Sequence, residues 1–302
     1  MSALTLRPLH PLFAAEASGL DMRRPLSAEQ VAAVVAAMDR YAVLVFRDQA
    51  MEQEEQVAMA GQFGPLNPGL KQIGRQMERM RERALIDISN LDAEGRPMAA
   101  DTKKMISQLA NQLWHSDSSF QSPAVSYSML NAVRLPAWGG ETEFADLRAA
   151  WDTLPARLKA MVEGREAEHF ALHSRITLLG DDGYSEEQLK ALPPVIWPLV
   201  RVHPGSGRTA LFCGIHARRI LGMPLAEGRM LLMDLLEHAT QPHLVYRHEW
   251  RAGDLVFWDN RCTLHRGRRY DMASPRELRR TTCDEVPVGA TPAGTGYAEA
   301  AE

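Results

Sequence analysis

Apolar residues recur with helical spacing in four segments of the chain. The first is SAEQVAAVVAAMDRY at 27–41, where Ser27 and Gln30 form a capping box that marks the start of a helix. A second helical pattern runs from about Glu52 to Phe63 and ends at a Gly-Pro pair. The same periodicity predicts two further helices, at 151–165 and 226–240.

Short apolar runs between turn residues predict strands in most of the remaining sequence. VLVF has the composition of a buried strand, and WPLVRVHPGSGRTALFCG predicts a hairpin whose turn is HPGSGR. Two or three more strands are expected near the C-terminus, and several between residues 111 and 150. Many short strands with a few helices predict a mainly β fold with helical insertions, of the sandwich or jelly-roll kind. The predicted strands are VLVF, LIDISN, the hairpin, DLVFWDNRCTLHRGRRYD and RELRRTTCDEV.

One domain over residues 1–288 accounts for these elements, because 302 residues are enough for a single large core. Residues 70–110 are polar, rich in Met and Arg, and weakly periodic, although LIDISN lies within them. Such long excursions are commonly lids or binding loops, so a variable, lid-like segment is expected here. The last residues, 289–302, are small and polar and are expected to form a flexible tail.

Composition and charge exclude several classes of protein. The chain is 45% hydrophobic and 24% charged with a formal net charge of −4, and it has no basic block, which argues against a nucleic-acid partner. Its three cysteines show no CxxC spacing, as expected for reduced thiols in the cytoplasm. No signal peptide or membrane-spanning run is present. We therefore expect a cytoplasmic protein that does not bind membranes.

Three residues offer the ligands of a metal site. His115 and Asp117 are two positions apart, so in a strand both side chains would project from the same face, and His265 follows in another strand-like segment. Two imidazoles and one carboxylate form the facial triad that holds Fe(II) and leaves positions open for a co-substrate and oxygen. An HxD motif is common by chance, so unrelated surface or core residues are the alternative.

Two arginines strengthen the metal hypothesis. Arg276 and Arg280 are four residues apart, so in a strand they share a face with Leu278 and Thr282. Two buried guanidiniums need anions, and an arginine fork binds a carboxylate such as the free end of 2-oxoglutarate. A surface salt-bridge face, with Glu277 and Arg279 on the other side, is the alternative.

The motifs resemble those of the 2,4-dichlorophenoxyacetate/2-oxoglutarate dioxygenases, which lie within the wider taurine dioxygenase family. The resemblance rests on the NQLWHSDSSF and GDLVFWDNRCTLHRGRRYD segments, and it extends over nearly the whole chain except residues 72–104 and the tail. It implies a double-stranded β-helix, or jelly roll, with the metal at one mouth of the barrel. Such an enzyme uses Fe(II), with 2-oxoglutarate and O2 as co-substrates.

The resemblance also implies roles for individual residues. His115, Asp117 and His265 match the iron ligands, Thr142 and Arg276 match the anchor of the distal 2-oxoglutarate carboxylate, and Trp258 matches a wall of that pocket. Three further residues are predicted to contact the substrate: Arg280, Lys71 and Asn111. Arg96 is a second basic candidate in the variable segment.

The expected reaction follows from this family. Decarboxylation of 2-oxoglutarate to succinate and CO2 would drive hydroxylation of an aryloxyalkanoate, a small acidic substrate, on the carbon beside its ether oxygen. The product would collapse to a phenol and glyoxylate. The alternatives are a taurine or alkylsulfonate dioxygenase, with a sulfonate against Arg280, and a non-catalytic jelly-roll binding protein of the cupin type. A homo-oligomer is also expected.

Overall fold

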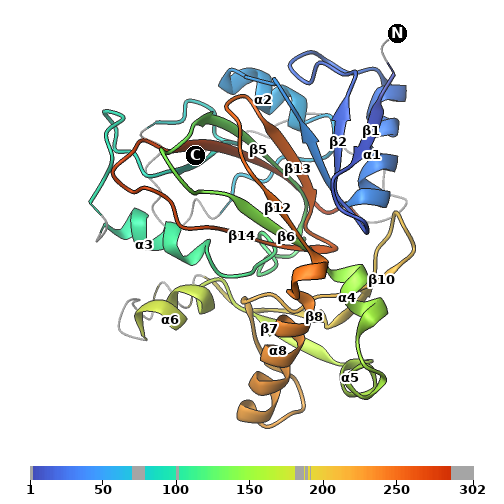
Figure 1. The fold of residues 1–302 in the computed structure, drawn as a ribbon. Helices are drawn as coiled ribbons and strands as arrows, with labels where there is room; N and C mark the ends of the chain where they lie inside the picture. The colour runs from blue at the N-terminus through green and yellow to red at the C-terminus, as the bar shows by residue number, and fades with distance from the viewer. Residues whose placement is uncertain are drawn as a thin grey trace, which may run out of the picture.

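Two β-sheets form the centre of the molecule, and helices lie outside both (Figure 1). The computed structural model describes residues 3–69, 79–99, 102–180, 187, 190 and 192–286. The larger sheet has seven strands in the order β1-β2-β3-β13-β5-β15-β4, and a three-stranded sheet has the order β12-β6-β14. The strands of the larger sheet are β1 (Thr5–Pro8), β2 (Ala15–Ser18), β3 (Val43–Phe46), β13 (Leu255–Asp259), β5 (Val125–Arg134), β15 (Glu277–Asp284) and β4 (Ile86–Ser89).

The two sheets enclose one apolar core. The smaller sheet consists of β12 (Val245–His248), β6 (Thr142–Asp146) and β14 (Thr263–Gly267). Phe144 from β6 packs in one cluster with Val43, Val256 and Trp258 from the larger sheet. This arrangement confirms the mainly β prediction and leaves the ends of β6, β14 and β15 at one end of the sandwich.

Strand β3 is apolar and buried at every position because both of its faces are covered. In β3, Val43 and Val45 face the sandwich core, whereas Leu44 and Phe46 pack against the helical layer. That layer contains α1 (Ala28–Tyr41) and α2 (Gln53–Ala60). The capping box of Ser27 and Gln30 is present at the start of α1, as predicted.

Beyond the smaller sheet, further helices and small sheets form a third core. Leu264 of β14 packs there with Leu231 and Leu235 of α8. The hairpin prediction is confirmed, because β9 and β10 pair across residues 203–208. These outer elements are α4 (Leu147–Thr153), α5 (Ala156–Val162), α6 (His173–Leu179), α8 (Leu225–Ala239), a 3-10 turn (Pro242–Leu244), β7 (Glu166–His169), β8 (Val195–Pro198), β9 (Val200–Val202), β10 (Thr209–Leu211) and β11 (Ala217–Ile220).

The predicted boundaries fail in identifiable places. The helix expected at 151–165 is instead two helices. Helix α4 ends at Thr153 and α5 begins at Ala156, and Pro155 between them is incompatible with a continuing helix. The excursion at 70–110 contains the predicted strand, as β4, but also a helix that the sequence pattern did not show, α3 (Lys103–Ala110). The predicted tail, 289–302, lies outside the described residues.

Candidate active site

The predicted metal ligands meet at the end of the sandwich. His265 lies on β14 and forms a reciprocal backbone bridge with His115. The Nε2 atom of His115 is 3.8 Å from Asp117 Oδ1, and the Nε2 atom of His265 is 3.7 Å from Asp117 Oδ2. Two ring nitrogens therefore converge on one carboxylate, as a facial triad requires. All three side chains are buried.

The HxD motif is not part of a regular strand, contrary to the expectation. His115 makes an isolated bridge, and a turn with Ser118 at a φ of 48° follows directly. The Oγ atom of Ser116 donates to the backbone oxygen of Thr263, which fixes this segment against β14. The two ligands share a side because of these long-range bonds rather than because of strand alternation.

The Asp117 carboxylate is held ionised by its neighbours. Burial by itself would raise its pKa, but Arg280, the two histidines and a hydrogen bond from Ser128 together lower the pKa of Asp117 to about 2. The Oδ1 atom accepts from Arg280 Nη1 at 2.5 Å, and Oδ2 accepts from Ser128 Oγ at 2.7 Å. A deprotonated carboxylate is the form that binds a metal.

Both histidines are held in the neutral form. Burial lowers the pKa of His115 and, more strongly, that of His265. The Nδ1 atom of His115 is 2.7 Å from the backbone oxygen of Leu113, which fixes the tautomer and leaves Nε2 as the ligand atom. The Nδ1 atom of His265 is buried without a partner among the described residues.

A buried arginine without an anion lies in the same pocket. Among the described residues, the guanidinium of Arg276 donates hydrogen bonds only to the backbone oxygens of Ile88 and Gly140, at 3.5 and 3.3 Å, and its Nε has no partner. The guanidinium also lies 5.0 Å from the ring centroid of Tyr270. Burial lowers the pKa of Arg276 to about 10. A carboxylate bound here would remove this cost, so the residues fit the distal end of 2-oxoglutarate.

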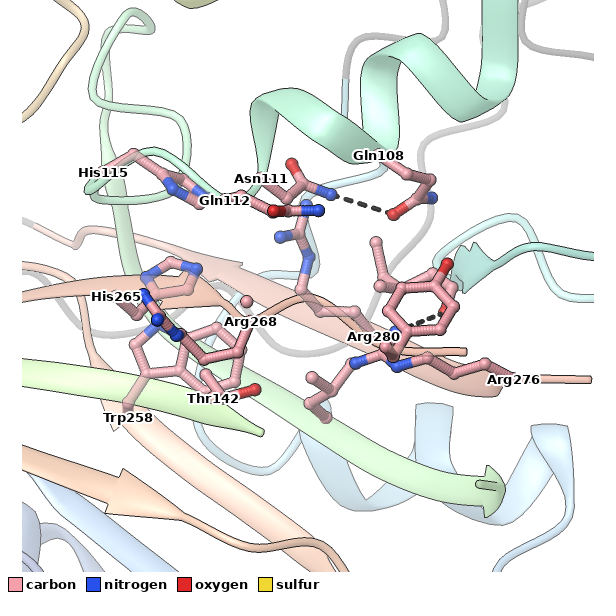
Figure 2. A pocket seen from close by; sticks show the side chains of 14 residues that line it. Gln108, Asn111, Gln112, His115, Thr142, Trp258, His265, Arg268, Arg276 and Arg280 are labelled. Atoms are coloured by element: carbon pink, nitrogen blue, oxygen red, sulfur yellow. Dashed lines mark hydrogen bonds between the residues drawn. The ribbon is translucent and has the colours of Figure 1, made fainter. Parts of the chain in front are cut away.

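Thr142 and Trp258 line the same pocket, as predicted (Figure 2). The hydroxyl of Thr142 accepts a hydrogen bond from the indole N–H of Trp250 at 3.1 Å, so its own proton is available to a ligand. The ring of Trp258 lies 4.8 Å from that of His265, between the metal ligands and the sandwich core.

Arg280 shares the pocket with Arg276, which confirms that the two arginines face one interior. The sequence predicted only an anion of the substrate as the partner of Arg280, but Asp117 also supplies one. Its Nε is buried and has no partner among the described residues. On the other face of β15, the surface alternative does not hold as stated, because Glu277 is buried and pairs with Arg79 and Arg279.

The C-terminal end of α3 forms the opposite wall of the pocket. Asn111 lines it, as predicted, and donates to Gln108 at 3.1 Å, and Gln112 lies beside them (Figure 2). Lys71, the other predicted substrate contact, lies outside the described residues. Arg96 is exposed and pairs with Asp92 and Glu94 instead of lining the pocket. The pocket residues that the sequence did not indicate include Gln108, Gln112, Arg268 and Tyr270.

A second group of ligand-type side chains does not form a comparable site. His203, Asp259 and Cys262 lie close together and are buried, a cluster that sequence spacing did not reveal. Both ring nitrogens of His203 are already bonded, to Ser206 and to Asp259. Arg261 forms a two-pronged ion pair with the same carboxylate. This cluster is therefore saturated by its own hydrogen bonds.

Comparison with known proteins decides the family. Residues 5–282 match the taurine catabolism dioxygenase TauD, TfdA family. The chain belongs to this family. The family prediction is therefore confirmed, and the protein is a dioxygenase rather than a non-catalytic cupin-type protein.

Individual relatives span nearly the whole chain. An alpha-ketoglutarate-dependent 2,4-dichlorophenoxyacetate dioxygenase from Cupriavidus pinatubonensis is 54% identical over 95% of this chain and 100% of its own length. A (S)-phenoxypropionate/alpha-ketoglutarate-dioxygenase from Sphingobium herbicidovorans is 36% identical over 91% of this chain and 92% of its own.

The crystal structure of AAD-2 in complex with Mn(II) and N-oxalylglycine superimposes with a TM-score of 0.85 and 43% identity. The superposition covers 93% of this chain and 97% of that one. This likeness and the family match confirm the jelly-roll prediction.

Proposed function

We propose that this dioxygenase uses Fe(II), 2-oxoglutarate and O2 to hydroxylate an aryloxyalkanoate, such as 2,4-dichlorophenoxyacetate, on the carbon beside its ether oxygen. The observation that carries the proposal is a buried arginine without an anion in the same pocket as two histidines and a carboxylate. The relatives named above for dichlorophenoxyacetate and phenoxypropionate support the substrate class.

The residues divide the work between metal, co-substrate and substrate. His115, Asp117 and His265 would hold Fe(II), which together with 2-oxoglutarate and O2 supplies the oxidising power. Arg276 and the hydroxyl of Thr142 would bind the distal carboxylate of 2-oxoglutarate. The protein thus contributes orientation and charge complementarity.

Arg280 would bind the substrate carboxylate. Its Nη1 is bonded to Asp117, but its buried Nε is without a partner among the described residues, so an N–H group is available to a second anion.

The reaction consumes one O2 and one 2-oxoglutarate for each ether cleaved. One oxygen atom enters succinate and the other enters the hydroxylated carbon. The resulting hemiacetal breaks its C–O bond to release the phenol and glyoxylate.

The test is a panel of aryloxyalkanoates and alkylsulfonates, with succinate and phenol measured separately. We expect both products in equal amounts from 2,4-dichlorophenoxyacetate and little turnover of its amide, which offers no anion to the Nε group of Arg280. Arg280→Gln should raise the KM of the acid, whereas Arg279→Gln, on the other face of β15, should not. Preference for taurine over every aryloxyacetate would instead favour a sulfonate substrate, and equal turnover of acid and amide would contradict the Arg280 anchor.

Three broader features belong to the same proposal. We infer that residues 1–288 form one catalytic domain and that it works in the cytoplasm, a setting that suits the three buried free cysteines. None of the described helices is both long and apolar enough to cross a membrane.

We also propose a homo-oligomer, supported by Leu225, Met230 and Met233, which are exposed on α8. Light scattering on the purified protein tests the oligomer.

A further inference from the structure

A chain of buried hydrogen bonds links two strands of the larger sheet to the carboxylate of Asp117. The hydroxyl of Ser128, on β5, donates to Asp117 Oδ2 at 2.7 Å. Asn260, directly after β13, donates from Nδ2 to the Ser128 hydroxyl at 2.9 Å. The exposed fraction is 0% for Ser128 and 1% for Asn260, so bulk water does not reach either side chain.

The direction of this chain is fixed by two N–H groups. The Oδ1 atom of Asn260 accepts from the backbone N–H of Asp117 at 2.9 Å and from the indole N–H of Trp258 at 3.0 Å. Neither donor can reverse its role, so the amide cannot turn over without placing N–H against N–H. Its NH2 group must therefore face Ser128, and the single hydroxyl proton of Ser128 must go to Asp117.

This direction determines how the carboxylate is presented. Ser128 holds Oδ2 and Arg280 holds Oδ1, so each oxygen accepts one hydrogen bond from the protein. The remaining lone pairs are those available to an ion bound by His115 and His265. Asn260 also joins the backbone of Asp117 to the indole of Trp258, a wall of the pocket expected to hold 2-oxoglutarate.

We propose that Ser128 and Asn260 are positioning residues that orient Asp117 for metal binding and hold it in register with the Trp258 wall. This inference rests on the metal site of the proposed function. Hydrogen-bond partners of metal ligands commonly change metal affinity by about 10- to 100-fold when they are removed. Such an effect is expected here because, among the described residues, Ser128 is the only hydrogen-bond donor to Asp117 Oδ2.

Ser126 provides a matched control on the same strand. It is also a buried serine, but its hydroxyl donates to the backbone oxygens of Cys283 and Asp284, each at 3.1 Å, rather than to Asp117. Ser126→Ala and Ser128→Ala each delete one buried hydroxyl from β5, so their general effects on packing are comparable. Only Ser128→Ala removes a hydrogen bond to Asp117, the carboxylate proposed to bind the metal.

The experiment is calorimetric titration of the metal-free full-length protein with Mn(II), together with its thermal unfolding midpoint. We expect Ser128→Ala to weaken Mn(II) binding by about 10- to 100-fold and Ser126→Ala to bind as the unmodified protein does. Both variants should unfold at similar temperatures in the absence of metal. Ser128→Cys, which nearly preserves the volume and retains a weak donor, should fall between Ser128→Ala and the unmodified protein.

The outcomes separate the two proposals. If the unmodified protein does not bind Mn(II), the metal site itself is wrong. If it binds Mn(II) but Ser128→Ala binds equally well, the positioning role is wrong and the metal site stands. Equal weakening in Ser126→Ala and Ser128→Ala would also overturn the positioning role, because the loss would then be one of general packing. If Ser128→Ala does not fold, Ser128→Cys decides by the same comparison.

Discussion

Each of the three side chains proposed to bind the metal is oriented by a different kind of neighbour. His115 is oriented by a backbone carbonyl, and Asp117 by a hydroxyl and a guanidinium. His265 is oriented by the reciprocal bridge of its own backbone and by the neighbouring rings of Phe144 and Trp258. The side chains are buried and yet contribute little to the apolar cores. Their replacement should therefore affect the metal far more than the fold.

His115→Ala is expected to abolish metal binding while the protein stays folded. Among the described residues its imidazole makes one hydrogen bond, to the carbonyl of Leu113, and it lies outside the apolar core clusters, so the fold should tolerate its loss. Turnover should fall by more than about 100-fold, since loss of a ligand exceeds loss of a supporting bond. Mn(II) titration and circular dichroism measure the two effects, and His243→Ala, at an exposed position, is the control. Near-normal turnover with bound iron would contradict the triad.

Arg276→Gln should weaken 2-oxoglutarate binding by about 10- to 100-fold, because a charge-assisted hydrogen bond contributes roughly 1.5–3 kcal/mol. Arg279→Gln is the matched control, because Arg279 pairs with Glu277 on the opposite face of β15. The measurement is the dissociation constant of 2-oxoglutarate with Mn(II) present. An unchanged constant in Arg276→Gln would place the carboxylate anchor elsewhere.

At the scale of elements, the pocket depends on a close approach between the turn before β6 and the segment that connects β14 to β15. Gly139 and Gly140 precede β6, and both have positive φ, at 73° and 82°. A Cβ on Gly139 would lie 2.2 Å from the backbone oxygen of Arg269, and one on Gly140 would lie 3.1 Å from Arg276 Nε. Glycine is therefore required at this turn for both conformation and space.

Gly140→Ala should disturb the arginine anchor without touching the metal ligands. The substitution strains the left-handed backbone by about 1 kcal/mol and crowds the guanidinium of Arg276. We expect weaker 2-oxoglutarate binding, by several-fold, with unchanged Mn(II) affinity. Gly164→Ala is a suitable control, because Gly164 also has a positive φ but nothing lies within 4 Å of its added Cβ. If the two substitutions weakened 2-oxoglutarate binding equally, the effect would come from backbone strain and not from crowding of the Arg276 guanidinium.

The whole molecule buries several histidines in the neutral form, which links its stability to pH. Burial, with Arg201 nearby, lowers the pKa of His169 to about 3 from an ordinary value of 6.5. Burial likewise lowers the pKa of His216 and His248. The unfolded chain therefore binds more protons than the folded chain in mildly acidic solution, and the free energy of unfolding must fall as the pH falls below 6.5.

His169→Phe tests this linkage. Its ring stacks on Phe212 with a centroid distance of 5.0 Å, so a phenyl ring suits the site. Between pH 6 and pH 4, His169 should cost about 1.4 kcal/mol of stability per pH unit, because its folded pKa of about 3 lies below this range. Urea unfolding measures the free energy of unfolding at each pH across this range. Its slope against pH should be smaller in the variant, by the equivalent of about one bound proton. An unchanged slope would mean that His169 titrates alike in the folded and unfolded states.

The sequence by itself determined those features that depend on nearby residues. The capping box of Ser27 and Gln30 marked the start of α1, and the even spacing of Arg276 and Arg280 predicted a shared face. The boundary at Pro155 and the helix α3 were missed. The helical spacing of apolar residues continues across Pro155, so it predicted one helix where there are two. Helix α3 lies in a polar segment whose apolar periodicity is too weak to indicate a helix.

Only the tertiary structure decided how the site is assembled. The bond between Arg280 and Asp117 spans 163 residues, and the bond between Asn260 and Asp117 spans 143. Such contacts leave no periodic signal, because they depend on how strands from distant parts of the chain are ordered in a sheet. The sequence therefore identified the groups that carry the chemistry, whereas the order of β5, β13 and β15 selected the side chains that hold them in place.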